Sequence, residues 1–71
     1  MSAEELFAGH RALLFSVAYE ILGSVADAED VLQESYLRWR EVDPGTVENP
    51  RAYLARIVTR QALNALRAAS R

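Results

Sequence analysis

The segment from residue 25 to residue 41 repeats its apolar side chains with the period of an α-helix, and this repeat constrains the fold more than any other feature. At about 100° per residue, its apolar positions cluster within about 90° of the helix circumference. They are Val25, Ala28, Leu32, Tyr36 and Trp39. The opposite side, the acidic face, consists of Asp27, Asp30, Gln33, Glu34, Leu37 and Glu41. We predict a core helix whose acidic face, with its isolated leucine, meets either water or a partner.

An earlier helix is predicted over residues 3–22, where apolar side chains again recur every three or four positions. Ser2 followed by Glu5 forms a capping box at its start, and Gly23 is suited to the left-handed residue that ends it. His10 lies within the apolar side. A lone histidine there is usually a packed residue with one hydrogen bond, and a pH-sensing role is the alternative.

Local capping and turn signals place the rest of the fold. Ser24 is expected to cap the second helix, with Asp27 closing a second capping box. The polar segment 42–49 contains Asp-Pro-Gly, which is typical of a turn. Asn49 then caps a third helix over residues 50–69. The predicted fold class is all-α: a compact three-helix domain, with room for a short extra turn in the loop.

Composition excludes several classes of function. At 71 residues the chain is one small domain, and its thin core predicts modest stability. It has no cysteine and one histidine, so neither a thiolate nor a multi-histidine metal site can form within it. We expect no metal and no cofactor. No apolar run approaches a membrane span, and the first residues are acidic where a signal peptide would be basic. We expect a soluble cytoplasmic protein, or a domain cut from one, with no membrane association.

The net charge of −2 hides an asymmetry between the two halves. Residues 1–34 hold seven acids against one base, whereas residues 35–71 hold three acids against seven bases, and every base is arginine. A dipolar domain of this kind favours two surfaces with different partners. Ordinary surface charge in an arginine-rich organism is the simpler alternative.

A basic stripe follows one side of the predicted third helix. Its members are Tyr53, Arg56, Arg60, Asn64, Arg67 and Arg71. A helix of 18 residues spans roughly 27 Å, so arginines at one-turn intervals can meet successive phosphates or reach base edges. Tyr53 could stack on an exposed base, and Asn64 could hydrogen bond to a base edge. A solvated basic face, or one paired with acids of another chain, is the alternative.

No pattern supports catalysis. The sequence contains no glycine-rich phosphate loop, no nucleophile elbow and no metal-ligand spacing. The carboxylates of the acidic face lie on an outward surface without a neighbouring base. We therefore expect a protein that is not an enzyme.

Two stretches resemble motifs of one known family. Residues 27–38, Asp-Ala-Glu-Asp-Val-Leu-Gln-Glu-Ser-Tyr-Leu-Arg, resemble the core-polymerase-binding motif of bacterial sigma factors of the extracytoplasmic-function (ECF) group. Residues 49–58, Asn-Pro-Arg-Ala-Tyr-Leu-Ala-Arg-Ile-Val, resemble the start of their promoter-recognition helix, and residues 64–67 fit its tail. The two motifs in this order and spacing are more specific than either alone. The resemblance covers nearly all of the chain.

The resemblance implies that residues 1–71 are sigma domain two, an all-helical module without catalytic activity. Its acidic helix would dock on the clamp coiled coil of the β′ subunit of RNA polymerase core. The residues at the matching positions are Asp27, Asp30, Gln33, Glu34 and Leu37. Its third helix would recognise the −10 promoter element and help melt it by capturing a flipped base of the non-template strand. The residues at those positions are Tyr53, Arg56, Arg60, Asn64 and Arg67, and residues 42–48 correspond to the loop that pockets the base.

Two positions depart from the family pattern. Family members usually carry tryptophan at the position of Tyr53 and often asparagine at that of Arg60, which leaves the preferred base open. The sequence of residues 29–39 and 50–54 resembles that of a subgroup whose members carry a fused C-terminal SnoaL-like regulatory domain. That domain and the −35-binding domain are absent, so the chain is expected to be an N-terminal fragment. An anti-sigma factor is a further partner that the family implies.

Two other classes of function remain open from the residues. A duplex-binding regulator of helix-turn-helix type would need a short recognition helix after a tight turn. The predicted third helix is long and follows a looser loop. A helical protein-interaction module, in which the arginines meet an acidic partner, is the other alternative.

Overall fold

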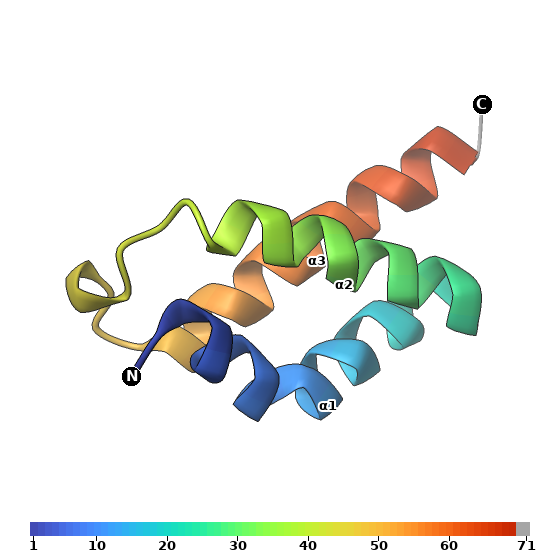
Figure 1. Cartoon of the computed structure of the whole chain (residues 1–71). Helices are drawn as coiled ribbons and strands as arrows, with labels where there is room; N and C mark the ends of the chain where they lie inside the picture. Colours follow the sequence, from blue (N-terminus) through green and yellow to red (C-terminus); the bar gives the residue numbers. More distant parts are fainter. Residues whose placement is uncertain (70–71) are drawn as a thin grey trace.

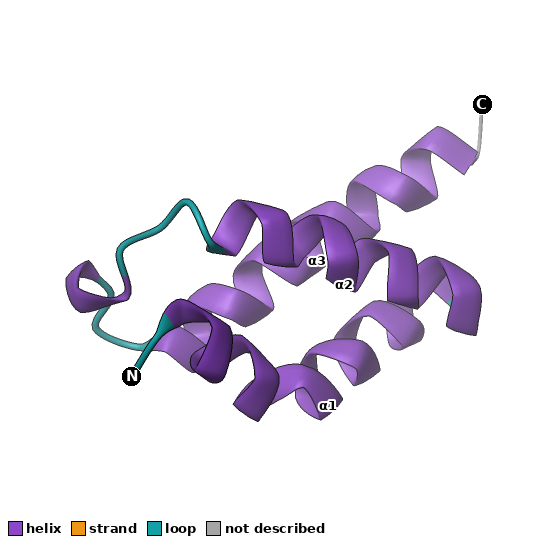
Figure 2. Cartoon of the chain, viewed as in Figure 1, coloured by secondary structure: helices purple, strands orange, loops and turns teal. Residues whose placement is uncertain are grey.

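The computed structural model describes residues 1–69 of the chain, which form three α-helices. They are α1 (Ala3–Leu22), α2 (Val25–Trp39) and α3 (Pro50–Ala69), with a 3-10 helix, η1 (Pro44–Thr46), in the last loop. α1 and α2 form an antiparallel hairpin, and α3 lies across it and packs against both (Figure 1). All regular structure in the described residues is helical (Figure 2). The all-α, three-helix prediction is confirmed, as is the extra turn in the loop.

The two ends of α1 match their predicted signals. The Ser2 hydroxyl accepts a hydrogen bond from the Glu5 N–H at 3.1 Å, and the Glu5 carboxylate accepts one from the Ser2 N–H at 3.3 Å. Gly23 adopts φ 68°, and its N–H donates to the Tyr19 carbonyl at 2.7 Å. Since a glycine adopts this left-handed conformation without a Cβ penalty, the chain can leave α1 and enter α2 within two residues.

The capping box makes the start of α1 sensitive to acid. Hydrogen bonds from the backbone and side chain of Ser2 lower the pKa of Glu5 from its ordinary value of 4.5. A carboxyl whose pKa is lower in the folded state stabilises that state fully above its unfolded pKa, and this contribution is lost as the pH falls through the folded pKa. We therefore expect Glu5→Gln to reduce the loss of stability below about pH 4.5, measured by urea unfolding at pH 6 and pH 3.5. Glu4→Gln is the control, and an equal effect of both substitutions would contradict the expectation.

The second capping box is only half formed. The Ser24 hydroxyl accepts from the Asp27 N–H at 3.2 Å, as predicted. Within residues 1–69, however, the Asp27 carboxylate accepts no bond from the Ser24 N–H. Aspartate is one methylene shorter than the glutamate that usually closes this motif. Asn49, by contrast, caps α3 as predicted, because its side-chain oxygen accepts from the Ala52 N–H at 3.1 Å.

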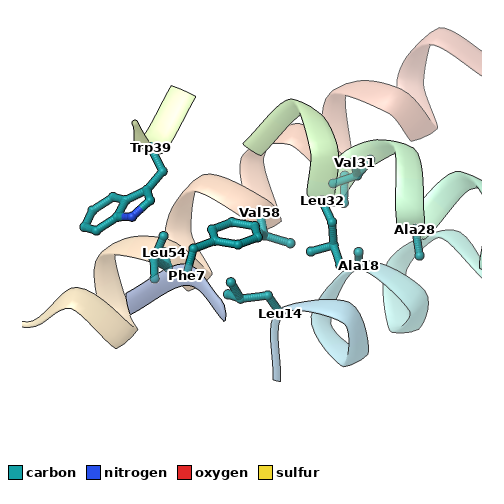
Figure 3. Packing of buried hydrophobic residues seen from close by; sticks show 10 residues of the cluster. Phe7, Leu14, Ala18, Ala28, Val31, Leu32, Trp39, Leu54 and Val58 are labelled. Carbon is teal, nitrogen blue, oxygen red and sulfur yellow. The ribbon is translucent and has the colours of Figure 1, made fainter. Parts of the chain in front are cut away.

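The core lies where the three helices meet (Figure 3). Its fully buried side chains come from every helix: Leu14, Ala18, Ala28, Leu32, Trp39, Leu54, Val58 and Ala62. The buried side of α2 was predicted with an error. Val25 is 59% exposed, whereas Val31 and Ser35 are buried. The buried arc is rotated by about 50° from the predicted one at 100° per residue. α2 packs between two helices, and its Val31 side turns toward α3.

Trp39 connects all three helices at one end of the domain. It is the last residue of α2, and its indole N–H donates to the carbonyl of Ala3, at the start of α1, at 2.6 Å. Its ring also packs beside Tyr53 of α3, with 5.7 Å between the ring centroids. The indole is fully buried. The position of Tyr53 is therefore tied to the packing of the other two helices.

His10 is a packed residue, as the first of the two interpretations predicted. The ring is half-buried, and its Nδ1 lies 2.8 Å from the carbonyl oxygen of Leu6, one turn earlier in α1. This is a packed histidine with one hydrogen bond.

None of the helices in residues 1–69 is both long enough and apolar enough to cross a bilayer.

Candidate functional site

The acidic face of α2 is exposed as predicted. Asp27, Asp30, Gln33 and Glu34 all reach solvent, and Leu37 keeps 45% of its surface exposed. Glu41 is exposed too, but it lies beyond the end of α2. Within residues 1–69 none of the acids of this face forms an ion pair. The result is a negatively charged helix surface with one large apolar side chain on it.

Two shallow grooves flank this face. The α2–α3 groove, of about 480 Å³, is lined by Asp27, Asp30 and Glu34 on one wall and by α3 residues on the other. The α1–α2 groove, of about 440 Å³, is lined by Asp30 and Gln33 together with α1 residues. Asp30 therefore borders both grooves, and Leu37 lines neither of them. The five predicted residues form one ridge between two grooves.

An ion pair between helices lies beside this ridge. Arg11 of α1 donates to the Glu29 carboxylate of α2 at 2.6 Å, and both side chains are about half exposed. An exposed pair of this kind contributes at most about 1 kcal/mol. Sequence reasoning missed it, because residues 18 positions apart become neighbours only once the hairpin forms. Its consequence for the surface is local: the charge of Glu29 is neutralised, and that of Asp30 is not.

The basic stripe of α3 is exposed, and the structure divides it into parts. Tyr53, Arg56 and Arg60 line one surface hollow of about 360 Å³, which we call the arginine hollow. Arg67 borders a second hollow, of about 320 Å³, with Arg56 and Arg60. Asn64 is exposed but lines the α2–α3 groove, next to the acids of α2. Arg71, the last member of the predicted stripe, lies outside the described residues.

Tyr53 is the aromatic centre of this surface. It is 38% exposed, and its ring centroid lies 5.7 Å from that of the buried Trp39 indole, with 53° between the ring planes. A further hollow, of about 460 Å³, joins Tyr53 and Arg56 to the loop that contains η1. The predicted loop and the start of α3 therefore border the same place. A partly exposed aromatic ring that contacts a buried indole has a restricted position, which makes it a preorganised surface for stacking.

One charged residue of the arginine hollow was not predicted. Arg38 lines it from α2, together with side chains of α3. The sequence places Arg38 only one position after Leu37 of the acidic face, and nothing local connects it to α3. Only the packing of α2 against α3 brings it to the hollow.

Among residues 1–69 there is no group of three histidine or carboxylate side chains that could hold a metal ion.

Comparison with known proteins places this domain in a family. The family model described as Sigma-70 region 2 matches residues 6–71. The ECF RNA polymerase sigma factor SigJ of Mycobacterium tuberculosis is 47% identical over 64 residues, which are 90% of this chain and 20% of SigJ. The probable ECF sigma factor SigI of the same species is 31% identical over 61 residues, 86% of this chain and 21% of SigI. No solved structure gives a significant match.

These matches extend over the whole three-helix unit. The chain spans about a fifth of the length of the curated relatives that it matches. The family model covers nearly all of α1 and the whole of α2 and α3, including both stretches on which the resemblance rested. The chain therefore belongs to the sigma-70 region 2 family, and its relatives in this comparison are ECF sigma factors.

Proposed function

We propose that this domain acts in transcription initiation, with α2 bound to RNA polymerase core and α3 bound to the −10 promoter element. Family membership and the names of the relatives support the general role. The observation that carries the two-partner proposal is the separation of charge. Unpaired acids surround Leu37 on α2, while Tyr53 and two arginines of α3 share a hollow without any acid in its lining.

The polymerase contact is assigned to the ridge of α2. We propose that Asp27, Asp30, Gln33, Glu34 and Leu37 meet the clamp coiled coil of the β′ subunit. Exposed carboxylates without partners steer association with a basic surface, and they act mainly on the rate of encounter. An apolar side chain at the centre of such a face becomes desolvated on binding, which is how a few residues come to dominate affinity. We expect Leu37 to be that centre.

The DNA contact is assigned to the exposed side of α3. Tyr53 would stack on an unpaired base of the non-template strand, with Arg56, Arg60 and Arg67 along the backbone. Each base–aromatic stack contributes about 1–3 kcal/mol. Asn64 was predicted in the same role, but it lies next to the acids of α2, which repel phosphates. We therefore expect Asn64 to contribute least to DNA binding.

Binding of single-stranded DNA tests this proposal. We expect a labelled non-template −10 oligonucleotide to bind better than its duplex, with an affinity that falls steeply with salt, as measured by fluorescence anisotropy. Tyr53→Ala should weaken binding by about 5- to 150-fold, the equivalent of one lost stack of about 1–3 kcal/mol. Tyr53→Trp should retain binding, because tryptophan also stacks. The measurement is repeated with polymerase core present.

The control is Tyr19→Ala, which removes a similarly exposed tyrosine from α1. Equal affinity for duplex and single strand would favour a helix-turn-helix type of regulator, although α3 is 20 residues long and follows a loop instead of a tight turn. An unchanged affinity in Tyr53→Ala would remove Tyr53 from the DNA site. Binding of an acidic protein in place of DNA would favour the interaction-module alternative.

A further inference from the structure

The arginine hollow receives guanidinium groups from two helices. Arg56 and Arg60 come from α3, and Arg38 comes from the last turn of α2. The remaining lining residues are Val42, Tyr53, Ile57 and Gln61. The lining therefore contains three positive charges and no acid. Such a hollow is suited to an anion that fits between two walls.

None of these three arginines is neutralised by the domain itself. Within residues 1–69 the one ion pair joins Arg11 to Glu29, on the other side of α2. Like charges gathered around one hollow repel one another, and an anion bound between them removes that repulsion. Guanidinium groups suit a phosphate particularly well, since their planar forks donate two parallel hydrogen bonds to its oxygens.

We propose that Arg38 completes a cradle for one backbone phosphate of single-stranded promoter DNA, gripping it from the side opposite Arg56 and Arg60. This inference rests on the proposed function, because it takes the DNA to be the anion. Tyr53 is partly exposed and lines the same hollow, so a base stacked on its ring would have its backbone beside these guanidinium groups. A phosphate, and not a base edge, is the natural ligand where three cations converge.

The cradle gives α2 a second role. Leu37 belongs to the ridge assigned to polymerase, and Arg38, the next residue, lines the hollow assigned to DNA. Successive residues of a helix point about 100° apart, so neighbours in sequence can serve two different surfaces. DNA binding therefore extends to α2, beyond α3 and the loop before it, where the resemblance placed it.

Arg38→Ala tests this inference, with Arg40→Ala as the matched control. Both residues are exposed, but Arg40 follows α2 and does not line the arginine hollow. We expect Arg38→Ala to weaken binding of the single-stranded −10 oligonucleotide about tenfold at low salt, the size of one lost charge-assisted hydrogen bond. The loss should be the same for oligonucleotides of different sequence. The plot of log K against log salt concentration should become less steep, by about 0.7, because one phosphate contact is lost. Arg38→Lys should recover part of the affinity, because it restores the charge without the fork.

The outcomes separate the inference from the proposal beneath it. If Arg38→Ala and Arg40→Ala have the same affinity and salt slope, Arg38 does not bind phosphate. If the loss is confined to one base at one position, Arg38 contacts a base edge, which also overturns the inference. If the unmodified domain binds no single strand, with or without polymerase core, the proposed function itself fails. Circular dichroism establishes that each variant is folded.

Discussion

Replacing Leu37 and Glu34 together with alanine is expected to weaken binding of a β′ clamp-helix fragment at least about 100-fold, if each residue is worth roughly 1.5–2 kcal/mol at the centre of the interface. Leu37 is the large apolar side chain exposed on the ridge, and Glu34 is an unpaired carboxylate beside it. Loss of Leu37 leaves a desolvated partner surface without contact, and loss of Glu34 removes part of the attraction that guides encounter. Isothermal titration calorimetry with the purified fragment measures the change.

A matched double variant controls for the loss of one apolar and one acidic group elsewhere. Val25 is an exposed apolar residue at the start of α2, and Glu20 is an exposed acid of α1. Val25→Ala with Glu20→Ala should leave fragment binding within about twofold of the unmodified domain. The single variants separate the two causes: Glu34→Ala should mainly slow association and reduce its salt dependence, and Leu37→Ala should mainly speed dissociation. Unchanged binding in the Leu37 and Glu34 double variant would rule out the ridge as the clamp contact.

Trp39→Ala is expected to leave the domain largely unfolded at 25 °C. Trp39 has no exposed surface, and truncation of a buried tryptophan costs about 3–5 kcal/mol. A single core of this size rarely supplies more than about 3–5 kcal/mol of net stability, so the loss is comparable with the whole. The substitution also removes the hydrogen bond to Ala3 and the ring that supports Tyr53. Helix content by far-ultraviolet circular dichroism, with urea titration, measures the change.

Trp39→Phe is the informative control, because it keeps an aromatic ring and removes the indole N–H. Its cost should be smaller, about 1–3 kcal/mol, from a smaller buried ring and the loss of the indole hydrogen bond to the Ala3 carbonyl. Arg40→Ala, one position later and exposed, should have little effect. An alanine variant at position 39 that unfolds at the same urea concentration as the unmodified domain would show that the indole is not the centre of the packing.

The helix bounds could be predicted from the sequence because their signals are local. Ser2, Gly23 and Asn49 act on backbone groups within four residues, so no knowledge of the fold is needed to read them. The rotation of the buried arc of α2 could not be predicted in this way. Periodicity alone treats one apolar side as facing one partner, whereas α2 contacts a helix on each flank, which buries Ser35.

The candidate site shows the same division. Helical spacing was enough to predict that the basic stripe of α3 lies on one exposed side. It could not predict that Asn64 would lie beside the acids of α2, or that Arg38 would join Arg56 and Arg60. Both depend on how α2 and α3 are placed against each other, and that placement is set by core contacts between residues far apart in the chain.

Trp39 fixes the positions of the three helices relative to one another at one end of the domain. Its indole is hydrogen-bonded to the start of α1, and it is the last residue of the helix that carries Leu37. Its ring also contacts Tyr53 in the first turn of α3. The spacing between the proposed polymerase contact and the proposed base contact is therefore set by a packed core and not by a mobile loop. In a transcription complex, such a domain would hold the first unpaired base at a fixed distance from the polymerase surface that α2 binds.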